Sequence, residues 1–449
     1  MDRSHRTWAT SDRWVPRTFI RPFVHFSTIE ASSGIVLLIA AIGAIVWANS
    51  AWSETYFSLL EEPLTFEFLG IHLEESVQDV INDGLMAIFF FVVGLEIKRE
   101  LVIGDLREPR AAALPVMAAL GGMIVPAAIY IAFNAGAGTE AIRGWGIPMA
   151  TDIAFALGIV ALLSSKVPPG AKLFLLAVAI TDDIGSIAVI AIFYTENLQV
   201  GYLTAAIGLL VLVWVGSKVT IRSHAFYVPL AIIIWYLVLE SGVHATLAGV
   251  ALGFLVPARP YYSRDEFNRR SRAILDEIPQ ELESTEDREH ADHEALLLAK
   301  IAKESVAPLT RNEHQLVGWS SFLIVPVFAL ANAGVDFRAV NLSEALTSPV
   351  ALGVSVGLVV GKMVGITGFT YAAVKLGLGK LPARTGWTHI VGLSAVAGIG
   401  FTVSLFVTSL AFNDPHLTDL AKVCIFAGSL IAGVVGSLVL IRAKPPTES

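Results

Sequence analysis

The sequence is poor in charge and contains a single cysteine. Lys, Arg, Asp and Glu make up only 16% of the 449 residues, against about 25% in soluble domains. A soluble globular protein is therefore excluded, because its exposed surface would need more charge. The 55% hydrophobic content excludes a disordered chain. Cys424 lies in an apolar run, which excludes a disulfide framework and indicates a small packed hydrophobe. The net charge of −8 gives no support to nucleic-acid binding. These deficits indicate a polytopic membrane protein.

Most of the chain consists of apolar runs of roughly the 20 residues that a transmembrane helix needs. We expect twelve of them, near residues 30–49, 78–98, 111–133, 144–164, 171–194, 201–217, 225–240, 243–258, 316–335, 349–374, 388–412 and 420–441. The sixth, seventh and eighth runs are short. Charge is concentrated outside the runs: residues 1–29 hold five basic and two acidic side chains, and residues 259–315 hold nine and thirteen.

Basic residues predict the orientation. If both ends are cytoplasmic, the inside segments carry 27 Lys and Arg, whereas the outside segments carry only Arg143, Arg338 and Lys422. This asymmetry fits the positive-inside rule. No apolar core precedes the first span, so we do not expect a signal peptide. The predicted order is a cytoplasmic arm (1–29), eight helices (30–258), an acidic cytoplasmic loop (259–315), four helices (316–442) and a cytoplasmic tail (443–449).

Two segments between the spans have a character of their own. Residues 64–73 partly alternate apolar and polar side chains around Gly70, as a small external β-hairpin would; a plain loop is the alternative. Two strands alone are only marginally stable, so such a hairpin could pair with a second copy of the chain. The 259–315 loop is expected to be partly helical or disordered.

Four ionisable side chains fall at mid-span: Asp152, Asp182, Asp183 and Lys362. Each costs at least about 2.5–3.5 kcal/mol on insertion scales. One aspartate and the lysine could form a structural ion pair that locks two helices, but three carboxylates exceed that need and favour a path for cations or protons. The adjacent Asp182 and Asp183 project about 100° apart on a helix. One can therefore pair with Lys362 while the other faces a water-filled cavity, and the hydroxyl of Thr151 offers a further oxygen to a small cation.

Two spans contain helix-breaking residues near their middle. The fourth contains GWGIPMATD (144–152) and the eleventh AGIGFT (397–402). Interrupted helices at corresponding places in two halves indicate a binding site in inverted-repeat transporters; glycines for close helix packing are the alternative. Broken helices leave dipole ends inside the membrane, where Asp152 could offset the positive ends and Lys362 the negative ends.

At these residues the sequence resembles the NhaA family of bacterial sodium/proton antiporters. The resemblance runs in order from the second to the eleventh span, and it implies an all-α membrane fold of twelve helices with inverted-topology repeats and unwound, crossing fourth and eleventh helices. The matching stretches are NDGLMAIFFFVVGLEIKRE (82–100), ATDIAFALG (150–158), LAVAITDDIGSIAV (176–189), SGVHATLAGV (241–250), FALANAGV (328–335), VGKMVGI (360–366) and AGIGFTVSLF (397–406).

The resemblance also implies a site. Asp183 is similar to the family's main cation and proton carboxylate, and Asp182 to the neighbour that pairs with the lysine at Lys362. These two carboxylates would bind sodium, and Thr151 and Asp152 fall at the unwound stretch of the fourth helix.

A second group of residues resembles positions that take part in the family's pH response. Glu96 and Glu100 are similar to acidic groups of the inside funnel. His244 matches a position linked to pH behaviour, although a helix-end histidine hydrogen-bonded near the outside interface is the interpretation we favour. The 259–315 loop is longer and more acidic than the family's usual connection; NEHQLVGW (312–319) keeps a likeness there and makes Glu313 a candidate.

The implied activity is electrogenic, pH-regulated export of sodium or lithium in exchange for external protons, by alternating access. The protein would lie in a bacterial inner membrane, contact membrane lipid, dimerise through the hairpin near 63–75 and need no cofactor. A sodium-coupled symporter is the main rival and would need a cavity for an organic substrate. An intramembrane hydrolase fits poorly, because its paired aspartates should lie on facing helices and no metal-ligand spacing is present. A channel is disfavoured because no stretch resembles a selectivity filter.

Overall fold

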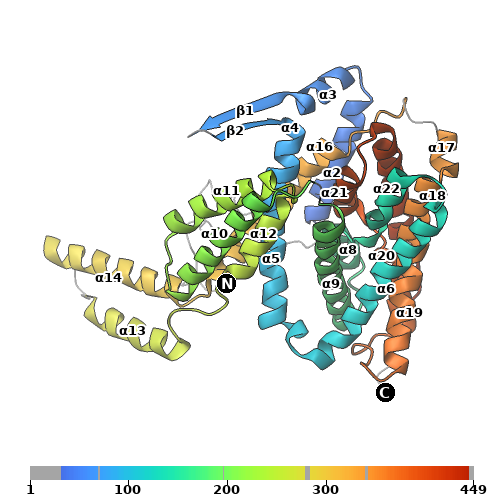
Figure 1. Cartoon of the computed structure of the whole chain (residues 1–449). Helices are drawn as coiled ribbons and strands as arrows, with labels where there is room; N and C mark the ends of the chain where they lie inside the picture. The colour runs from blue at the N-terminus through green and yellow to red at the C-terminus, as the bar shows by residue number, and fades with distance from the viewer. Residues whose placement is uncertain (1–31, 69–70, 196, 279–283, 339–341, 444–449) are drawn as a thin grey trace.

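The chain folds almost entirely into helices (Figure 1). The computed structural model describes residues 32–68, 71–195, 197–278, 284–338 and 342–443. The expected arm 1–29 lies outside the described residues, as does all of the expected tail 443–449 except its first residue.

Eight helical stretches are long and apolar enough to cross a membrane. Five helices within them begin with a proline, whose ring presets the helical φ and whose missing N–H would have no partner there. The eight stretches are Val77–Val102, Pro109–Asn134, Thr139–Leu162, Pro169–Phe193, Val200–Lys218, Pro308–Asn332, Pro349–Lys375 and Pro415–Arg442.

Two pairs of bent helices raise the number of candidate spans to ten. Helix α2 (Ser32–Ala48) meets α3 (Ser53–Glu61) at 110°, and α20 (Trp387–Val396) meets α21 (Phe401–Ala411) at 46°. Two shorter apolar helices, α11 (His224–Glu240) and α12 (Thr246–Leu255), lie where the seventh and eighth spans are expected. The chain therefore has eight to ten candidate spans, and twelve spans stay a prediction.

Helix α12 is short but packs very closely on α5 (Met86–Val102). A Cβ atom at Gly249 would lie 2.0 Å from the carbonyl oxygen of Ala87, and one at Gly253 would lie 2.7 Å from that of Phe91. Glycine at these positions lets the two backbones touch, which is the usual way in which helices associate in lipid.

The centre of the molecule is occupied by α21. All residues from Phe401 to Thr408 are buried, as expected for a helix that is enclosed on every side. The ring of Phe406 lies 5.4 Å from that of Phe90 and 6.3 Å from that of Phe328. Helices far apart in sequence therefore meet around this segment.

The expected β-hairpin is confirmed, and its position outside the membrane stays a prediction. Strand β1 (Pro63–Phe68) pairs antiparallel with β2 (Ile71–Ser76), with Pro63 opposite Ser76. Figure 1 shows it extending outward from α3 and the short helix α4 (Val77–Asp79).

The acidic loop forms two further helices, α13 (Arg264–Glu277) and α14 (Thr285–Glu304), which project away from the long helices (Figure 1). Serine starts both of them: Ser263 accepts a hydrogen bond from the amide of Glu266, and Ser284 forms a capping box with Asp287. The next helix, α15 (Pro308–Trp319), begins inside the expected loop, because Pro308 offers a better helix start than the apolar run that follows it.

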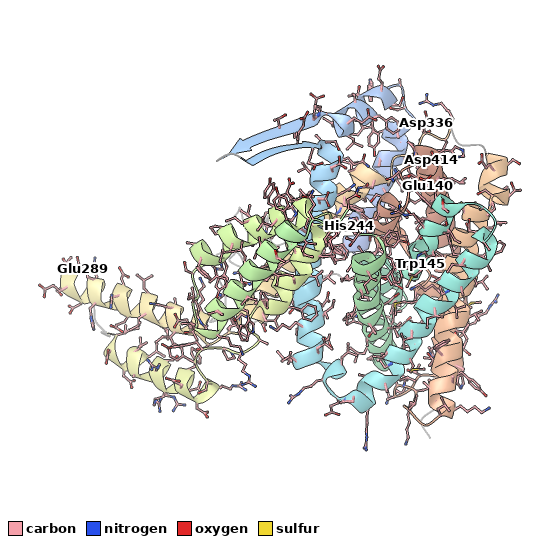
Figure 2. All side chains as sticks on the ribbon, viewed as in Figure 1. Glu140, Trp145, His244, Glu289, Asp336 and Asp414 are labelled. Carbon is pink, nitrogen blue, oxygen red and sulfur yellow. The ribbon has the colours of Figure 1, made fainter. Side chains whose placement is uncertain are left out.

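The end of the molecule that carries the hairpin also gathers short polar connections. Figure 2 shows Glu140, Asp336 and Asp414 close to that end. Glu140 accepts hydrogen bonds from the amides of Asn413 and Asp414 at 3.2 and 3.0 Å. Hydrogen bonds from Arg338 hold the pKa of Asp336 below its usual range.

Candidate functional site

Two interrupted helices meet at the centre of the bundle. Helix α7 (Thr139–Arg143) continues as the 3-10 helix η6 (Gly144–Met149), and the chain is then non-helical until α8 (Ile153–Leu162). The second break, residues 397–400, separates α20 from α21. The amide of Asp152 donates a hydrogen bond of 2.6 Å to the carbonyl of Ile399, so the two breaks are in direct contact.

The Asp152 carboxylate caps the N-termini of both half-helices. One oxygen accepts from the amide of Phe155 at 3.1 Å, at the start of α8. The other accepts from the amide of Thr402 at 3.1 Å and from its hydroxyl at 2.6 Å, at the start of α21. Helix α21 begins after Gly400, which has no side chain to cap it. A buried anion between two positive helix ends is favourable, and Asp152 is only 2% exposed.

Lys362 contacts the first break. It is the first residue of α19 (Lys362–Lys375), directly after the π-helical turn η8 (Gly357–Gly361). Its ammonium forms an ion pair with Asp182 on α9 (Pro169–Phe193). It also donates a hydrogen bond of 3.0 Å to the hydroxyl of Thr151. The lysine and Asp182 are fully buried, with exposures of 0% and 1%.

Thr151 connects this ion pair to the end of a helix. Its hydroxyl oxygen lies 2.8 Å from Asp182 Oδ2 and 2.9 Å from the carbonyl oxygen of Ala397, so its single proton has two acceptors within reach. Ala397 is the residue that ends α20. The lysine charge is therefore held beside a negative helix end, which is where a cation is stabilised.

The neighbouring carboxylates hold oxygen atoms without partners. Asp183 Oδ1 and Asp182 Oδ1 are both buried, and neither has a hydrogen-bond partner among the described residues. An unsatisfied buried carboxylate oxygen is costly. Two of them on consecutive residues of α9 offer ligands to a proton or to a small hard cation, which prefers oxygen.

The matches to known proteins agree with this architecture. A family model described as Na+/H+ antiporter 1 matches residues 24–440. The chain belongs to the NhaA family of Na+/H+ antiporters. It is 45% identical over 436 residues to the Na(+)/H(+) antiporter NhaA of Koribacter versatilis, covering 96% of this chain and 94% of the relative. It is 46% identical over 431 residues to that of an Anaeromyxobacter species, covering 96% and 93%. Its membership of this family and its apolar helices together show that the chain is a multi-pass membrane protein.

The acidic residues that resemble the NhaA pH-response positions lie around one arginine. Arg99 on α5 forms an ion pair with Glu313 on α15, and its guanidinium lies 3.6 Å from the carboxylate of Glu100. Glu96 lies one helical turn before Glu100 on the same helix. The structure thus brings Glu100 and Glu313 to the same side chain across 213 positions of sequence. Among the residues it describes, no three His, Cys, Asp or Glu side chains could hold a resident metal ion.

His244 lies at the end of α9 rather than beside the aspartates. Its Nε2 donates a hydrogen bond of 2.8 Å to the carbonyl of Tyr194, which ends that helix. Tyr194 follows Asp183 by 11 residues, about 16 Å along a helix. The tyrosine hydroxyl in turn donates to the carbonyl of Arg143 and accepts from the amide of Gly146. Figure 2 shows His244 between α9 and the group formed by α10 (Val200–Lys218), α11 and α12. The helix-end interpretation of this histidine fits that position.

Two partners of the candidate site residues could not be identified from the sequence. Thr402 stood in a quoted motif, but nothing marked it as the partner of Asp152; a threonine directly after an interrupted Gly-x-Gly is a signal that could have found it. The sequence does not distinguish Arg99, because basic residues near span ends are common. The break at residues 397–400 is closely packed: a Cβ atom at Gly398 would lie 2.3 Å from the carbonyl oxygen of Leu358, so glycine is needed there.

Proposed function

We propose that the protein exports sodium, and also lithium, in exchange for protons across a bacterial inner membrane. Membership of the NhaA family supports the reaction class. The observation that carries the proposal is a pair of buried carboxylate oxygens, on Asp182 and Asp183, beside two interrupted helices. Neither oxygen has a hydrogen-bond partner in the described ranges. Sodium and protons are both satisfied by such oxygens, so they compete for one site.

In the proposed cycle, Asp183 is the principal carrier. Sodium from the cytoplasm displaces protons from Asp183 and Asp182, and Lys362 compensates the charge of Asp182 while the site is empty. More protons than sodium ions move per cycle, so exchange is electrogenic and responds to the membrane potential, at about 2.3 kcal/mol per charge per 100 mV. The cargo is the only ion required, and no cofactor takes part.

Alternating access is the proposed transport step. The two interrupted helices leave non-helical backbone around the site, which is tolerated at membrane depth only where protein or a water-filled cavity surrounds it. We propose that inverted repeats carrying these helices rock about the fixed site. The eight continuous stretches, the two bent pairs and the two shorter helices would together make twelve spans with both termini cytoplasmic.

The proposed pH response involves the groups around Arg99. Protonation of Glu96, Glu100 or Glu313 would weaken their attraction to the arginine, and α5 and α15 would then separate more easily. His244 joins the loop before α12 to the end of α9. None of these ion pairs and hydrogen bonds includes Asp183 itself, so their variants should shift the pH profile and leave the maximal rate largely unchanged.

A homodimer formed through the hairpin at Pro63–Ser76 is also proposed. A two-stranded sheet leaves unpaired backbone groups on both edges, and pairing with a second copy would satisfy one of them. The lipid-exposed apolar faces of α10 and α11 would remain in contact with the bilayer. Deletion of the hairpin should give monomers in detergent, measured by size-exclusion chromatography with light scattering, while exchange persists.

The test uses everted membrane vesicles that hold a respiration-driven pH gradient, reported by a fluorescent amine. Sodium, lithium or potassium chloride is added across a pH series. Dequenching by sodium and lithium, lost in Asp183→Asn and retained in the exposed control Glu289→Gln, is expected. No response at any pH, with the protein present in the membrane, would reject antiport and direct attention to substrate-dependent sodium uptake by a symporter.

A further inference from the structure

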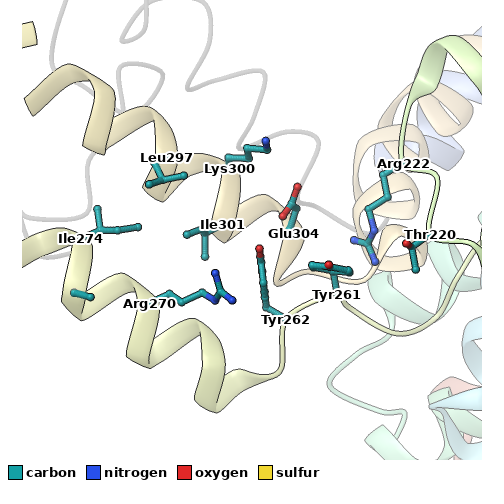
Figure 3. Close-up of a pocket in the computed structure, with 11 residues that line it drawn as sticks. Thr220, Arg222, Tyr261, Tyr262, Arg270, Ile274, Leu297, Lys300, Ile301 and Glu304 are labelled. Carbon is teal, nitrogen blue, oxygen red and sulfur yellow. The ribbon is translucent and has the colours of Figure 1, made fainter. Parts of the chain in front are cut away.

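A cavity of about 530 Å³ opens beside α13 and α14, outside the long helices (Figure 3). Small-molecule sites typically have volumes of about 300–1,000 Å³. Its walls come from three parts of the chain: the connection between α10 and α11, the segment before α13, and the facing sides of α13 and α14. The polar side chains that line it are Thr220, Arg222, Tyr261, Tyr262, Arg270, Lys300 and Glu304.

Basic side chains dominate the charge of the cavity. Arg222, Arg270 and Lys300 line it, against the single carboxylate of Glu304. Arg270 is hydrogen-bonded to Glu266 at 2.9 Å. Arg222 is different: its Nη1 is buried and has no hydrogen-bond partner within the described part of the chain. A buried charged donor without an acceptor is unfavourable, and an anionic ligand in the cavity would supply the acceptor.

Two tyrosine rings hold the arginines in place. The Arg222 guanidinium lies 5.0 Å from the ring centre of Tyr261, and the Arg270 guanidinium lies 4.6 Å from that of Tyr262. The two rings are 4.8 Å apart. A guanidinium that lies over a ring keeps its in-plane N–H donors available, as Arg222 does, and this fork matches a phosphate group. Two donors of Arg270, in contrast, are already bound to Glu266. Aromatic faces beside such donors also suit a planar heterocycle, because base–aromatic stacking contributes about 1–3 kcal/mol.

From this combination we propose that the cavity binds a nucleoside phosphate from the cytoplasm. The phosphates would lie against Arg222 and Lys300, the base against the tyrosine rings, and Glu304 would accept a hydrogen bond from an amino or hydroxyl group. A lipid phosphate would use the cations but would leave the tyrosines and Glu304 without a role. The position of α13 and α14, projecting from the long helices (Figure 1), also favours a soluble ligand.

Hydrogen bonds connect the cavity to the helix that carries the partner of Arg99. The amide of Tyr261 donates to the carbonyl of Glu304 at the end of α14, at 3.0 Å. Arg311 on α15 donates to the carbonyl of Lys303, at 3.2 Å. Helix α15 also carries Glu313, the partner of Arg99. A ligand that draws α13 and α14 together would therefore displace α15, and nucleotide binding would change the apparent affinity for sodium. This second half rests on the proposed antiport.

Binding is tested with the purified full-length protein in nanodiscs, by isothermal titration calorimetry with ATP. Saturable binding is expected. The double variant Arg222→Gln/Lys300→Gln should weaken it by about tenfold or more, equivalent to about 1.4 kcal/mol. Arg269→Gln is the matched control, because Arg269 is an exposed arginine of α13 outside the cavity lining, and it should bind ATP normally. Absence of saturable binding, or equal binding by all three proteins, would overturn the proposal.

Two further arms separate the sources of phosphate. Inorganic phosphate should bind more weakly than ATP, because it cannot contact the tyrosines. The titration is repeated in nanodiscs of neutral lipid and of anionic lipid. ATP binding in neutral nanodiscs supports the soluble ligand. Binding of anionic lipid that depends on Arg222 and Lys300, with no ATP binding in either nanodisc, would assign the cavity to lipid and reject the proposal.

The link to transport is measured in proteoliposomes, with ATP on the side that holds α13 and α14. ATP should change the apparent KM for sodium in the wild type and leave it unchanged in the double variant. Sodium exchange that ATP does not alter would reject the link. If sodium drives no exchange at all, the proposed antiport fails, whereas the calorimetric result still decides the binding site.

Discussion

The hydroxyl of Thr402 donates a hydrogen bond of 2.6 Å to the carboxylate of Asp152, across 250 positions of sequence. The same carboxylate oxygen also accepts from the amide of Thr402. One buried contact therefore fastens the start of α21 to the start of α8. Because both helices are interrupted there, the bond fixes how the two breaks lie relative to each other and to Asp182.

Thr402→Val tests this contact. Valine keeps the shape of threonine but removes the donor, so Asp152 retains only the backbone amide on that oxygen. We expect a loss of about 1–3 kcal/mol in the free energy of unfolding, seen as a lower melting temperature in detergent, together with slower exchange. Thr408→Val is the matched control: Thr408 is also buried on α21, but its hydroxyl donates a hydrogen bond within its own helix, to the carbonyl of Ser404. Equal losses in both variants would contradict a special role for Thr402.

The chemistry of the centre was predictable because charge is so costly in a membrane. Asp152, Asp182, Asp183 and Lys362 stood out in the sequence as charges within apolar runs, and the structure brings Asp182 and Lys362 into an ion pair. Their partners were not predictable in the same way. Thr402 is ordinary in an apolar helix, and its role depends on which segment lies opposite, which is a property of the tertiary fold.

The helix boundaries were harder to predict than the residues of the site. A hydropathy pattern marks where apolar residues begin, whereas a helix begins where its first amides find acceptors or a proline removes one. This is why α15 starts at Pro308, ahead of the apolar run. The sequence shows α12 only as a short apolar run. Its glycines pack against α5, and a hydropathy pattern within one run contains no information about contacts with another helix.

The single variant Lys362→Ala should be less stable than the double variant that also removes its partner, Asp182. The substitution leaves the Asp182 carboxylate buried without its cation, and breaking a buried pair costs about 3–5 kcal/mol. In the double variant Lys362→Ala/Asp182→Ala, neither charge of the pair remains, so part of the stability should return while exchange stays lost. Thermal unfolding of the single and double variants measures this. If the double variant is no more stable than Lys362→Ala, the ion pair does not account for the loss.

Gly365→Ala tests the packing that positions Lys362. A Cβ atom at Gly365 would lie 2.1 Å from the carbonyl oxygen of Gly121 on α6 (Pro109–Asn134), so the two helices would have to separate. Overpacking of this kind costs about 1–3 kcal/mol. Gly368→Ala lies on the same helix with nothing within 4 Å of its new Cβ. It should leave stability and exchange unchanged or slightly improved, because alanine favours a helix over glycine. A similar loss in both variants would rule out close packing as the cause.

Competition at Asp183 predicts how sodium affinity depends on pH. If protons and sodium occupy the same oxygens, the apparent KM for sodium rises as pH falls while the maximal rate stays constant. Each displaced proton changes KM by about tenfold per pH unit on the acid side of the profile, so two protons give about a hundredfold. Dequenching measured across sodium concentration and pH gives this slope directly. Asp183→Glu should retain exchange with a displaced profile, and Glu289→Gln, at the exposed tip of α14 (Figure 2), should match the wild type. A maximal rate that falls with pH at constant KM would show that protons act elsewhere than at the sodium oxygens.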